Sequence, residues 1–517
     1  MNRLRRFIIN GSLMAIVAVL MRSVAVAFSV YISNKIGAVA MGLFSLVSTI
    51  YGFGITFATS GINLATTRLV AQAIGDTSSE AEARKNKNSA KVKCILSRCI
   101  IYSLLFSSIA TLALWFLSDT IGINILKDSR TVSSLRILSL TFIPISVSSV
   151  LNGYFSAIRQ VVKNAVTQIL GQGIKIYASV AFLSLVMAND VESACTAVVL
   201  GGAVAEIASF AISLFLYFLS RPRSKEKSVT SEKKKATSNI ISNSIPLALS
   251  AYMRSALVTI EHILIPQGLE KSGSSKDTSL AAYGTVGGMV FPLVLFPSAV
   301  SAAFAGLLIP EVAESVQTHD DKRIKGIITT VMETVLIFSI GCAGIIMSFS
   351  LKLGNSVYPQ SRDAGKYILM IAPLIPVMYL DTAIDAMLKG MGEHVYSMCV
   401  NIADAFISVI LVAILLPKMG IDGYIVTVYF TEILNATLSI TRLLSKSKVK
   451  TRALLWVGRP LACVIASTKL TGFMINADNV WLHVAFASVL YLLLLVITGG
   501  IKPKTIVDRT KYILTKK

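Results

Sequence analysis

Long apolar runs separated by short polar segments recur along the whole chain. Runs of about 18 or more apolar residues with few charges are typical of helices that cross a bilayer. A large soluble protein with an apolar core is the alternative, and the repetition of such runs argues against it. The pattern predicts an all-α polytopic membrane protein with about fourteen spans, at residues 10–33, 41–66, 95–118, 132–158, 164–188, 193–219, 241–266, 283–310, 325–349, 366–388, 395–417, 420–441, 453–474 and 480–500.

The positive charge of the chain is unevenly distributed over the predicted loops. Of the 517 residues only 15% are charged, yet the net charge is +22. With a cytoplasmic N-terminus, the segments predicted to lie inside hold most of the Lys and Arg, which is the usual bias of membrane proteins. We therefore expect a multi-pass protein of the plasma membrane with both termini in the cytoplasm. The basic runs are expected to contact anionic membrane lipids, and not nucleic acid.

A short motif occurs once in each half of the sequence. Met21-Arg22-Ser23 returns as Met253-Arg254-Ser255, and each copy lies about 13 residues into its span, roughly 20 Å at about 1.5 Å per residue. The spans that follow the two copies are both rich in small residues. Since six spans separate the copies, both run in the same direction, which indicates a parallel internal repeat. The predicted domains are an N-terminal lobe (1–220), a basic cytoplasmic linker (221–240), a C-terminal lobe (241–443), and an additional helix pair with a basic tail (444–517).

The two repeated arginines are the first candidates for a binding site. A charge at the centre of a spanning helix costs on the order of 2.5–3.5 kcal/mol, so Arg22 and Arg254 should face protein or water. A buried ion pair would account for one such arginine. Two at matching depth favour a shared central cavity, in which their planar donor groups would bind phosphate or pyrophosphate.

Further polar side chains are expected inside the spans. Gln168, Gln172 and Lys175 share one helix face and either line the same cavity or pack against other helices. Glu261 follows Arg254 by about two turns and is a further candidate for the cavity lining. The carboxylates of Asp381, Asp385 and Asp404 either neutralise the arginines or bind a coupling ion or proton.

The sequence carries no signature of a cofactor or of a catalytic centre. Its six cysteines and four histidines form no metal-ligand motif, and we expect neither a bound metal nor a cofactor. Transport can still be coupled to the membrane potential, to Na⁺ or to H⁺. No nucleophile elbow or phosphate-binding loop occurs. We therefore expect a transporter and no enzyme, although an intramembrane glycosyl- or phosphotransferase that uses the carboxylates remains an alternative.

Several segments resemble a known family of transporters. They include "IINGSLMAIVAVLMRSVAVAFSVYISNKIGAVAMGLFSLVSTIYGF", "SGINLATTRLVAQ", "YGTVGGMVFPLVLFPSAVSAAFAGLLIPEVAES" and "LLPKMGIDGYIVTVYF". The chain is similar to the stage V sporulation protein B group of polysaccharide transporters, whose superfamily includes lipid II flippases and multidrug and toxin extruders. The resemblance implies two six-helix lobes around a central cavity and a C-terminal helix pair. Arg22 and Arg254 match in kind the arginines thought to meet the lipid pyrophosphate in the flippases, whereas the second span offers only Arg68, near its end.

The resemblance and the arginines together favour one function over the alternatives. We expect a flippase that moves an undecaprenyl-pyrophosphate-linked saccharide, a peptidoglycan precursor or another envelope polysaccharide unit, to the outer leaflet by alternating access. A multidrug antiporter of the same fold is the first alternative, and it would need a cavity dominated by carboxylates. A scaffold of an envelope-building complex is a further one. The sequence leaves open which glycan is carried, and whether the role is in sporulation or in ordinary wall growth.

Overall fold

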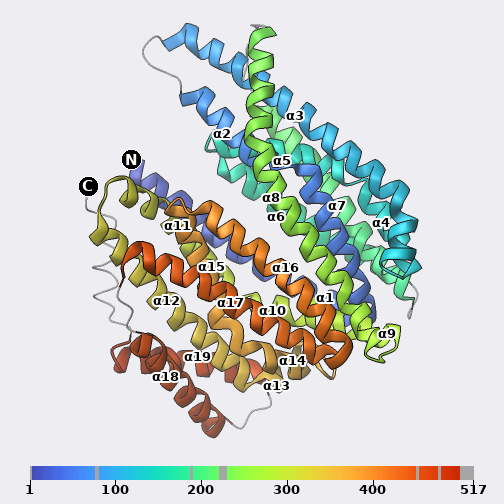
Figure 1. Cartoon of the computed structure of the whole chain (residues 1–517), viewed down its shortest axis with the longest axis vertical. Coiled ribbons are helices and arrows are strands. Elements are labelled where there is room, and N and C mark those ends of the chain that lie inside the picture. Colours follow the sequence, from blue (N-terminus) through green and yellow to red (C-terminus); the bar gives the residue numbers. More distant parts are fainter. Residues whose placement is uncertain are drawn as a thin grey trace. The chain divides into compact units, whose positions relative to one another are not determined.

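The computed structural model describes residues 3–75, 81–186, 190–220, 230–449, 453–475 and 479–500, and all regular elements in this part of the chain are helices (Figure 1). Each predicted span falls mainly on helical residues. By length and composition, nine helices among the described residues could cross a membrane, or up to ten if the bent pair Ser129–Ser139 and Phe142–Ala157 forms one span. The predicted all-α membrane architecture is confirmed, whereas the total of fourteen crossings stays a prediction.

The chain is divided into two compact units. We call Val39–Leu264 the N-unit, and Met1–Ala38 with Ile265–Lys517 the C-unit. The predicted lobes follow the sequence halves, and their bounds stay a prediction. In the structure the start of the chain belongs to the C-unit, and residues up to Leu264 belong to the N-unit. Of the predicted linker, residues 221–229 lie outside the described residues, as does the predicted tail from residue 501.

The first helix is shared between the units and changes direction at a glycine. Helix α1 (Arg3–Thr59) is interrupted at Gly37, whose φ of 79° and ψ of 173° are not helical. Such a backbone conformation is essentially restricted to glycine. The boundary between the units follows directly, at Ala38 and Val39. Gly37 is therefore the point where one continuous helix becomes two segments in two units.

The N-unit packs around a core formed by α2, α3 and α5. A contiguous group of buried side chains includes Leu69, Leu96 and Phe155, one from each of these helices. Gly153 lets α5 approach α2 closely, since a Cβ there would lie 2.6 Å from the Asn63 carbonyl oxygen. Besides α1 from Val39, the helices of this unit are α2 (Ile62–Gly75), α3 (Ala81–Asp119), η1 (Thr120–Ile125), η2 (Ser129–Thr131), α4 (Val132–Ser139), α5 (Phe142–Ala157), α6 (Val161–Ser184), α7 (Val191–Ser220) and α8 (Thr230–Lys271) as far as Leu264.

The C-unit holds the remaining helices. After α1 as far as Ala38 and the end of α8, they are α9 (Lys276–Tyr283), η3 (Gly284–Val290), α10 (Phe291–Leu295), α11 (Ser298–Gln317), α12 (Asp321–Ser348), α13 (Ser350–Val357), α14 (Ala364–Ile371), η4 (Ala372–Leu374), α15 (Ile375–Gly390), α16 (His394–Met419), α17 (Ile421–Ser447), α18 (Ala453–Met474) and α19 (Val480–Ile497). Two hydrogen bonds attach the start of the chain to this unit, from Ser29 Oγ to the Gly288 oxygen (3.3 Å) and from Asn34 Nδ2 to the Val357 oxygen (2.7 Å).

The C-terminal helix pair packs against α12 at two glycines. A Cβ at Gly341 would lie 2.4 Å from the Tyr491 ring of α19, and one at Gly344 would lie 2.5 Å from Val464 of α18. The Tyr491 hydroxyl also donates to the Ile337 oxygen at 2.6 Å. Since lipid tails are as apolar as the helices, such close packing and hydrogen bonding are what hold helices together in a membrane.

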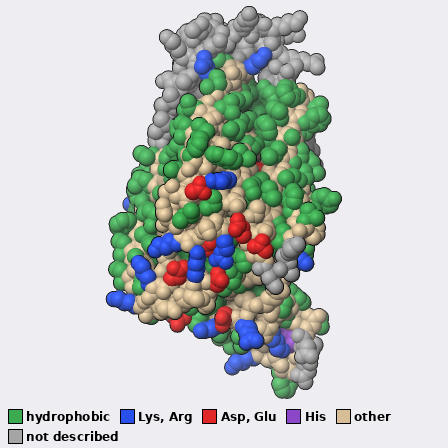
Figure 2. Space-filling model, turned by 90° about the vertical axis from the view of Figure 1, so that its right-hand side faces the viewer, with side chains coloured by type: hydrophobic (Ala, Val, Ile, Leu, Met, Phe, Trp, Pro, Cys, Tyr) green, Lys and Arg blue, Asp and Glu red, His purple; other side chains and the backbone are tan. Residues whose placement is uncertain are grey.

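Large apolar side chains remain exposed on many helices of both units. They include Phe116, Tyr177, Phe215, Leu454 and Phe473. Figure 2 shows one face on which hydrophobic side chains cover wide areas and most charged side chains lie in the lower half of the view. A water-soluble protein rarely exposes so much contiguous apolar surface, whereas contact with lipid favours it.

Candidate functional site

Arg22 is exposed and lies on the part of α1 that belongs to the C-unit. Its charge acts on the hydroxyl of Tyr379, a fully buried residue of α15 that donates a 2.7 Å hydrogen bond to the Val294 oxygen. Val294 lies just before Phe296 and Pro297, which separate α10 from α11. The break leaves backbone carbonyls without helical partners, and Tyr379 satisfies one of them. The guanidinium therefore lies near a polar point in an otherwise apolar bundle.

Arg254 is likewise exposed, on the part of α8 that belongs to the N-unit. Its neighbours hold the helix against α1: Tyr252 donates a 2.6 Å hydrogen bond to Ser60 Oγ, and Ser255 donates a 3.4 Å one to Thr56 Oγ1. Residues 252 and 255 share a face, and at about 100° per residue Arg254 points away from it. Packing of α8 against α1 therefore leaves the guanidinium outside the contact.

Neither arginine forms an ion pair or a hydrogen bond with another residue in the described part of the chain. Arg22 of the C-unit and Arg254 of the N-unit thus each present an exposed guanidinium, and both come from the repeated Met-Arg-Ser motif. Such a group on a membrane-spanning segment requires water or an anionic ligand nearby. That the two arginines bind one ligand together stays a prediction.

The other candidates of the first half lie in the N-unit. On α6, Gln168 is exposed, while Gln172 and Lys175 are half-buried. Lys175 lies within electrostatic reach of Glu206 on α7. Glu261 is half-buried on α8. The polar stripe on α6 is therefore part of one unit together with Arg254, and its role as a cavity lining stays a prediction.

The carboxylates proposed for coupling lie in the C-unit in different surroundings. Asp381 on α15 accepts a 3.4 Å hydrogen bond from Asn435 of α17, and Asp404 is half-buried on α16. Asp385 accepts hydrogen bonds from the Ser397 hydroxyl and from Lys389 Nζ, the latter at 2.5 Å. Asp385 therefore joins the end of α15 to the start of α16 through a side-chain network.

Sequence reasoning missed a second network beside Asp385. Glu393, between α15 and α16, accepts hydrogen bonds from Arg442 (2.7 Å) and pairs with Lys446 (2.9 Å), both near the end of α17. The Arg442 guanidinium also covers the ring of Tyr396. Lys446 and Arg442 hold the pKa of the Glu393 carboxyl below its usual value. The spacing of Arg442 and Lys446 places both on one helix face, and this was the only sign of the network in the sequence. The sequence does not show that Glu393 lies within reach of that face.

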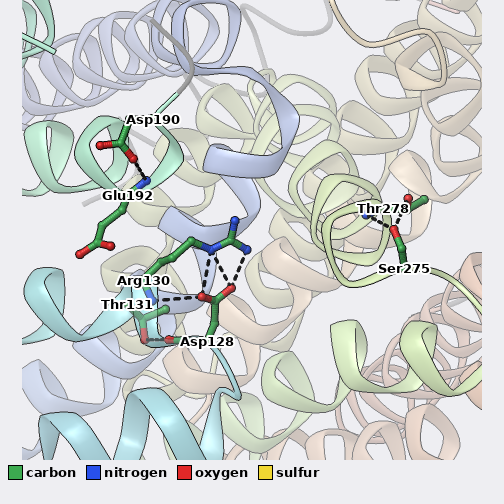
Figure 3. A network of polar contacts seen from close by, with 7 residues as sticks. All are labelled: Asp128, Arg130, Thr131, Asp190, Glu192, Ser275 and Thr278. Atoms are coloured by element: carbon green, nitrogen blue, oxygen red, sulfur yellow. Dashed lines mark hydrogen bonds and ion pairs between the residues drawn. The ribbon is translucent and has the colours of Figure 1, made fainter. Parts of the chain in front are cut away.

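Two loops of the N-unit hold an aspartate in local hydrogen bonds (Figure 3). Asp128 accepts hydrogen bonds from the backbone N–H of Arg130 at 3.1 Å and from its guanidinium at 2.8 Å. Asp190 accepts from the Glu192 backbone N–H at 3.1 Å and from the Ser193 hydroxyl, and this hydroxyl holds the pKa of the Asp190 carboxyl below its usual value. These local bonds order the loops and leave little capacity for a ligand.

The described residues offer no centre for a metal, since no group of three or more His, Cys, Asp or Glu side chains is placed to hold an ion in this part of the chain. A cavity of about 540 Å³ in the C-unit is lined by α12, α15, α17 and α18. Its lining includes Leu336, Pro376 and Val464 and no charged side chain. The cavity suits an aliphatic group and not a charged head group.

Comparison with known proteins assigns the family. Residues 8–310 match the family model described as polysaccharide biosynthesis protein. The chain belongs to this family. Stage V sporulation protein B of Bacillus subtilis (strain 168) is 23% identical to this chain over 423 residues, which cover 80% of this chain and 79% of that protein. The resemblance recognised in the sequence is thereby confirmed.

Solved structures of other proteins share the fold of this polysaccharide biosynthesis family member. The lipid II flippase MurJ in an inward closed conformation superposes with a TM-score of 0.68 at 13% identity, covering 95% of this chain and 98% of that one. A multidrug resistance MATE family transporter of the MOP superfamily, in an inward-facing conformation, gives a TM-score of 0.66 at 13% identity, with 84% and 100% covered. At such identities the likeness establishes the fold, and it fits flippases and drug transporters alike.

Proposed function

We propose that this protein is a flippase that moves a polyprenyl-pyrophosphate-linked saccharide, with undecaprenol as the lipid, from the inner to the outer leaflet of the plasma membrane. The observation that carries the proposal is the pair of exposed guanidinium groups, Arg22 on the C-unit and Arg254 on the N-unit, neither of which has an acidic partner among the described residues. Family membership and the fold shared with MurJ support it. The cargo is a peptidoglycan precursor or another unit of an envelope polysaccharide.

In this proposal each arginine binds oxygens of one pyrophosphate group. A guanidinium is charged at any physiological pH, and its fork of donors binds phosphate oxygens in bidentate fashion. The two guanidinium groups would bind the head group while the saccharide stays in water and the lipid tail stays in the apolar phase. The protein then acts as a transporter and not as an enzyme, because no bond of the cargo is made or broken.

Transport would proceed by alternating access, as one part of the protein rocks against the other. Moving an anionic head group outward is favoured by an inside-negative potential, which is worth about 2.3 kcal/mol per charge at 100 mV. Both termini would lie in the cytoplasm. No cofactor is required, and the partners would be the lipid-linked saccharide and the surrounding membrane lipids.

A coupling ion or proton has one favoured position in this proposal. Asp381 and Asn435 join α15 to α17 inside the C-unit, and an ionised carboxylate on a spanning helix needs a cation, a proton or a donor nearby. Asp404 is half-buried on α16 of the same unit, whereas Asp385 pairs with Lys389 and accepts a hydrogen bond from Ser397. Asp381 and Asp404 are therefore the carboxylates we assign to Na⁺ or H⁺ coupling.

A multidrug antiporter is the alternative function that a specific observation favours. The fold is shared with a MATE transporter, and half-buried carboxylates are present in the C-unit. This alternative predicts that the ligand is an organic cation, which Asp381 and Asp404 would attract and Arg22 would repel. A membrane transferase lacks support of this kind.

The experiment that separates these functions is reconstitution of the purified protein in liposomes with a panel of cargoes. We expect movement of an undecaprenyl-pyrophosphate-linked saccharide between leaflets, scored by its accessibility to an added glycan-cleaving enzyme, and no uptake of a cationic dye. Dye transport without leaflet exchange would assign the antiporter. Release of a transferred sugar or phosphate from a labelled lipid-linked substrate would assign the transferase.

A further inference from the structure

A lysine and a glutamate of opposite charge lie at the same level inside the N-unit. Lys175 is near the middle of α6, Glu206 is near the middle of α7, and the two side chains attract each other electrostatically. Both residues are half-buried. Groups of this kind within spanning helices are costly and are retained where they have a structural or functional use.

Two reciprocal contacts between glycine and serine fix the level of this pair. A Cβ at Gly171 would lie 2.2 Å from Ser209 Oγ, and a Cβ at Gly201 would lie 2.1 Å from Ser179 Oγ. Lys175 lies midway between Gly171 and Ser179 in the sequence. The antiparallel helices α6 and α7 are thus in close contact one turn above and one turn below the lysine, so its position relative to α7 is tightly determined.

The two charges do not close into a contact ion pair. No hydrogen bond and no ion pair within 4.0 Å joins Lys175 to Glu206 or to any other residue in the described ranges. The Glu206 carboxylate also acts on Tyr51 of α1, whose hydroxyl lies 2.8 Å from Thr141 Oγ1 at the break between α4 and α5. The carboxylate therefore stabilises the charge on the ammonium while the three donors of the ammonium stay available.

The polar residues around Lys175 lie on a different side of α6 from the exposed apolar residues of that helix. The exposed apolar side chains Val166, Ile169, Leu170 and Tyr177 cluster on one side. At about 100° per residue, Gln168, Gln172 and Lys175 lie on the opposite side, and Gln168 is exposed there. Helix α6 coincides with the fifth predicted span, and an exposed amide in such a span would need water or a polar ligand. The donors of this stripe suit the oxygens of a phosphate or of a saccharide.

We propose that Lys175 binds a phosphate oxygen of the cargo and that Glu206 is its built-in counter-ion, which the arriving phosphate replaces. This inference rests on the proposed function and adds a third cation to Arg22 and Arg254. Without ligand, Glu206 balances the charge of the half-buried ammonium. When a phosphate binds, the ammonium turns toward it and loses part of its attraction to Glu206. This loss makes the binding free energy of the phosphate less favourable. Lys175 thus selects for an anionic head group while Glu206 keeps binding weak enough for release.

Binding to the purified full-length protein in phosphatidylcholine nanodiscs tests this assignment. The probes are undecaprenyl pyrophosphate, undecaprenol as the uncharged control, and inorganic pyrophosphate, which distinguishes a lipid head group from free phosphate as the source. We expect wild type to bind undecaprenyl pyrophosphate, Lys175→Gln to bind it about tenfold more weakly, and Glu206→Gln to bind it severalfold more tightly. The double variant Lys175→Gln/Glu206→Gln should match Lys175→Gln.

A charge exchange separates this role from a merely structural pair. Lys175→Glu/Glu206→Lys keeps the attraction between α6 and α7, so its thermal unfolding midpoint should stay near that of wild type while binding weakens about tenfold. Restoration of wild-type binding by the exchange, or equal weakening by both single glutamine variants, would overturn the inference. Binding of undecaprenyl pyrophosphate by wild type and Lys175→Gln alike would overturn only the role of Lys175. Absence of binding to wild type, together with absent leaflet exchange, would overturn the proposed function as well.

Discussion

The hydroxyl of Tyr252 donates a 2.6 Å hydrogen bond to Ser60 Oγ and thereby joins α8 to the turn that follows α1. The rings of Tyr252 and Phe57 pack against each other at 5.4 Å. These contacts connect residues almost two hundred positions apart in the sequence, within the same unit. The seventh predicted span is thus packed against helices of the first half of the sequence. This packing fixes the position of the helix that carries Arg254.

Removing this hydroxyl tests the attachment. Tyr252→Phe keeps the ring contact and deletes the hydrogen bond, so we expect a loss of unfolding free energy of about 0.5–1.5 kcal/mol, measured by titration with a denaturing detergent. Tyr177→Phe is the matched control, since Tyr177 is 79% exposed and its hydroxyl has no hydrogen bond among the described residues. Equal stability of the two variants would contradict the proposed importance of the bond.

The kink of α1 depends on the backbone conformation of one glycine. At Gly37 a Cβ would meet nothing within 4 Å, so the penalty of Gly37→Ala comes from the positive φ alone. We expect a destabilisation of about 1–3 kcal/mol, or a straightened helix with a changed transport rate. Gly52→Ala on the same helix also meets no atom within 4 Å but has helical geometry, and it should be neutral or stabilising by about 0.5–1 kcal/mol. The comparison is made by thermal unfolding and by transport in liposomes.

Two neighbouring glycines of α7 differ in how closely other atoms approach them. A Cβ at Gly201 would lie 2.6 Å from backbone atoms of Ser179, whereas one at Gly202 would meet nothing within 4 Å. Gly201→Ala should therefore force the helices apart and destabilise the protein by about 1–3 kcal/mol, while Gly202→Ala should not. A cysteine cross-link between α6 and α7 at the level of Lys175 would report the separation directly. Unchanged stability of Gly201→Ala would show that the contact is not tight.

The network at Glu393 predicts a dependence of stability on pH. Its folded-state pKa lies below the unfolded value because Lys446 and Arg442 stabilise the carboxylate. The stabilisation is therefore complete above the unfolded pKa, about 4.3, and is lost as the pH falls through the folded pKa. Wild type should lose stability in this acidic range, and Glu393→Gln should lose less of it. Asp363→Asn, at an exposed residue before α14, is the control that should retain the wild-type profile.

The sequence predicted the helices well because bilayer thickness imposes long apolar runs. It also singled out Arg22 and Arg254, because a charge deep in an apolar run is visible without a structure. It could not show that α1 as far as Ala38 belongs to the C-unit and α8 as far as Leu264 to the N-unit, because membership of a unit depends on tertiary contacts such as Tyr252 with Ser60. Nor could it pair Lys175 with Glu206, since the Gly–Ser contacts that align α6 and α7 appear only in three dimensions.

The most direct test of the central claim is the rate of leaflet exchange of an undecaprenyl-pyrophosphate-linked saccharide by Arg22→Ala and Arg254→Ala in liposomes with equal protein content. Each variant loses a charge-assisted contact to phosphate, so we predict that each is at least about tenfold slower than wild type. Arg362→Ala, at an exposed arginine in the loop between α13 and α14, should exchange at the wild-type rate. Wild-type exchange by both Arg22→Ala and Arg254→Ala would contradict the account.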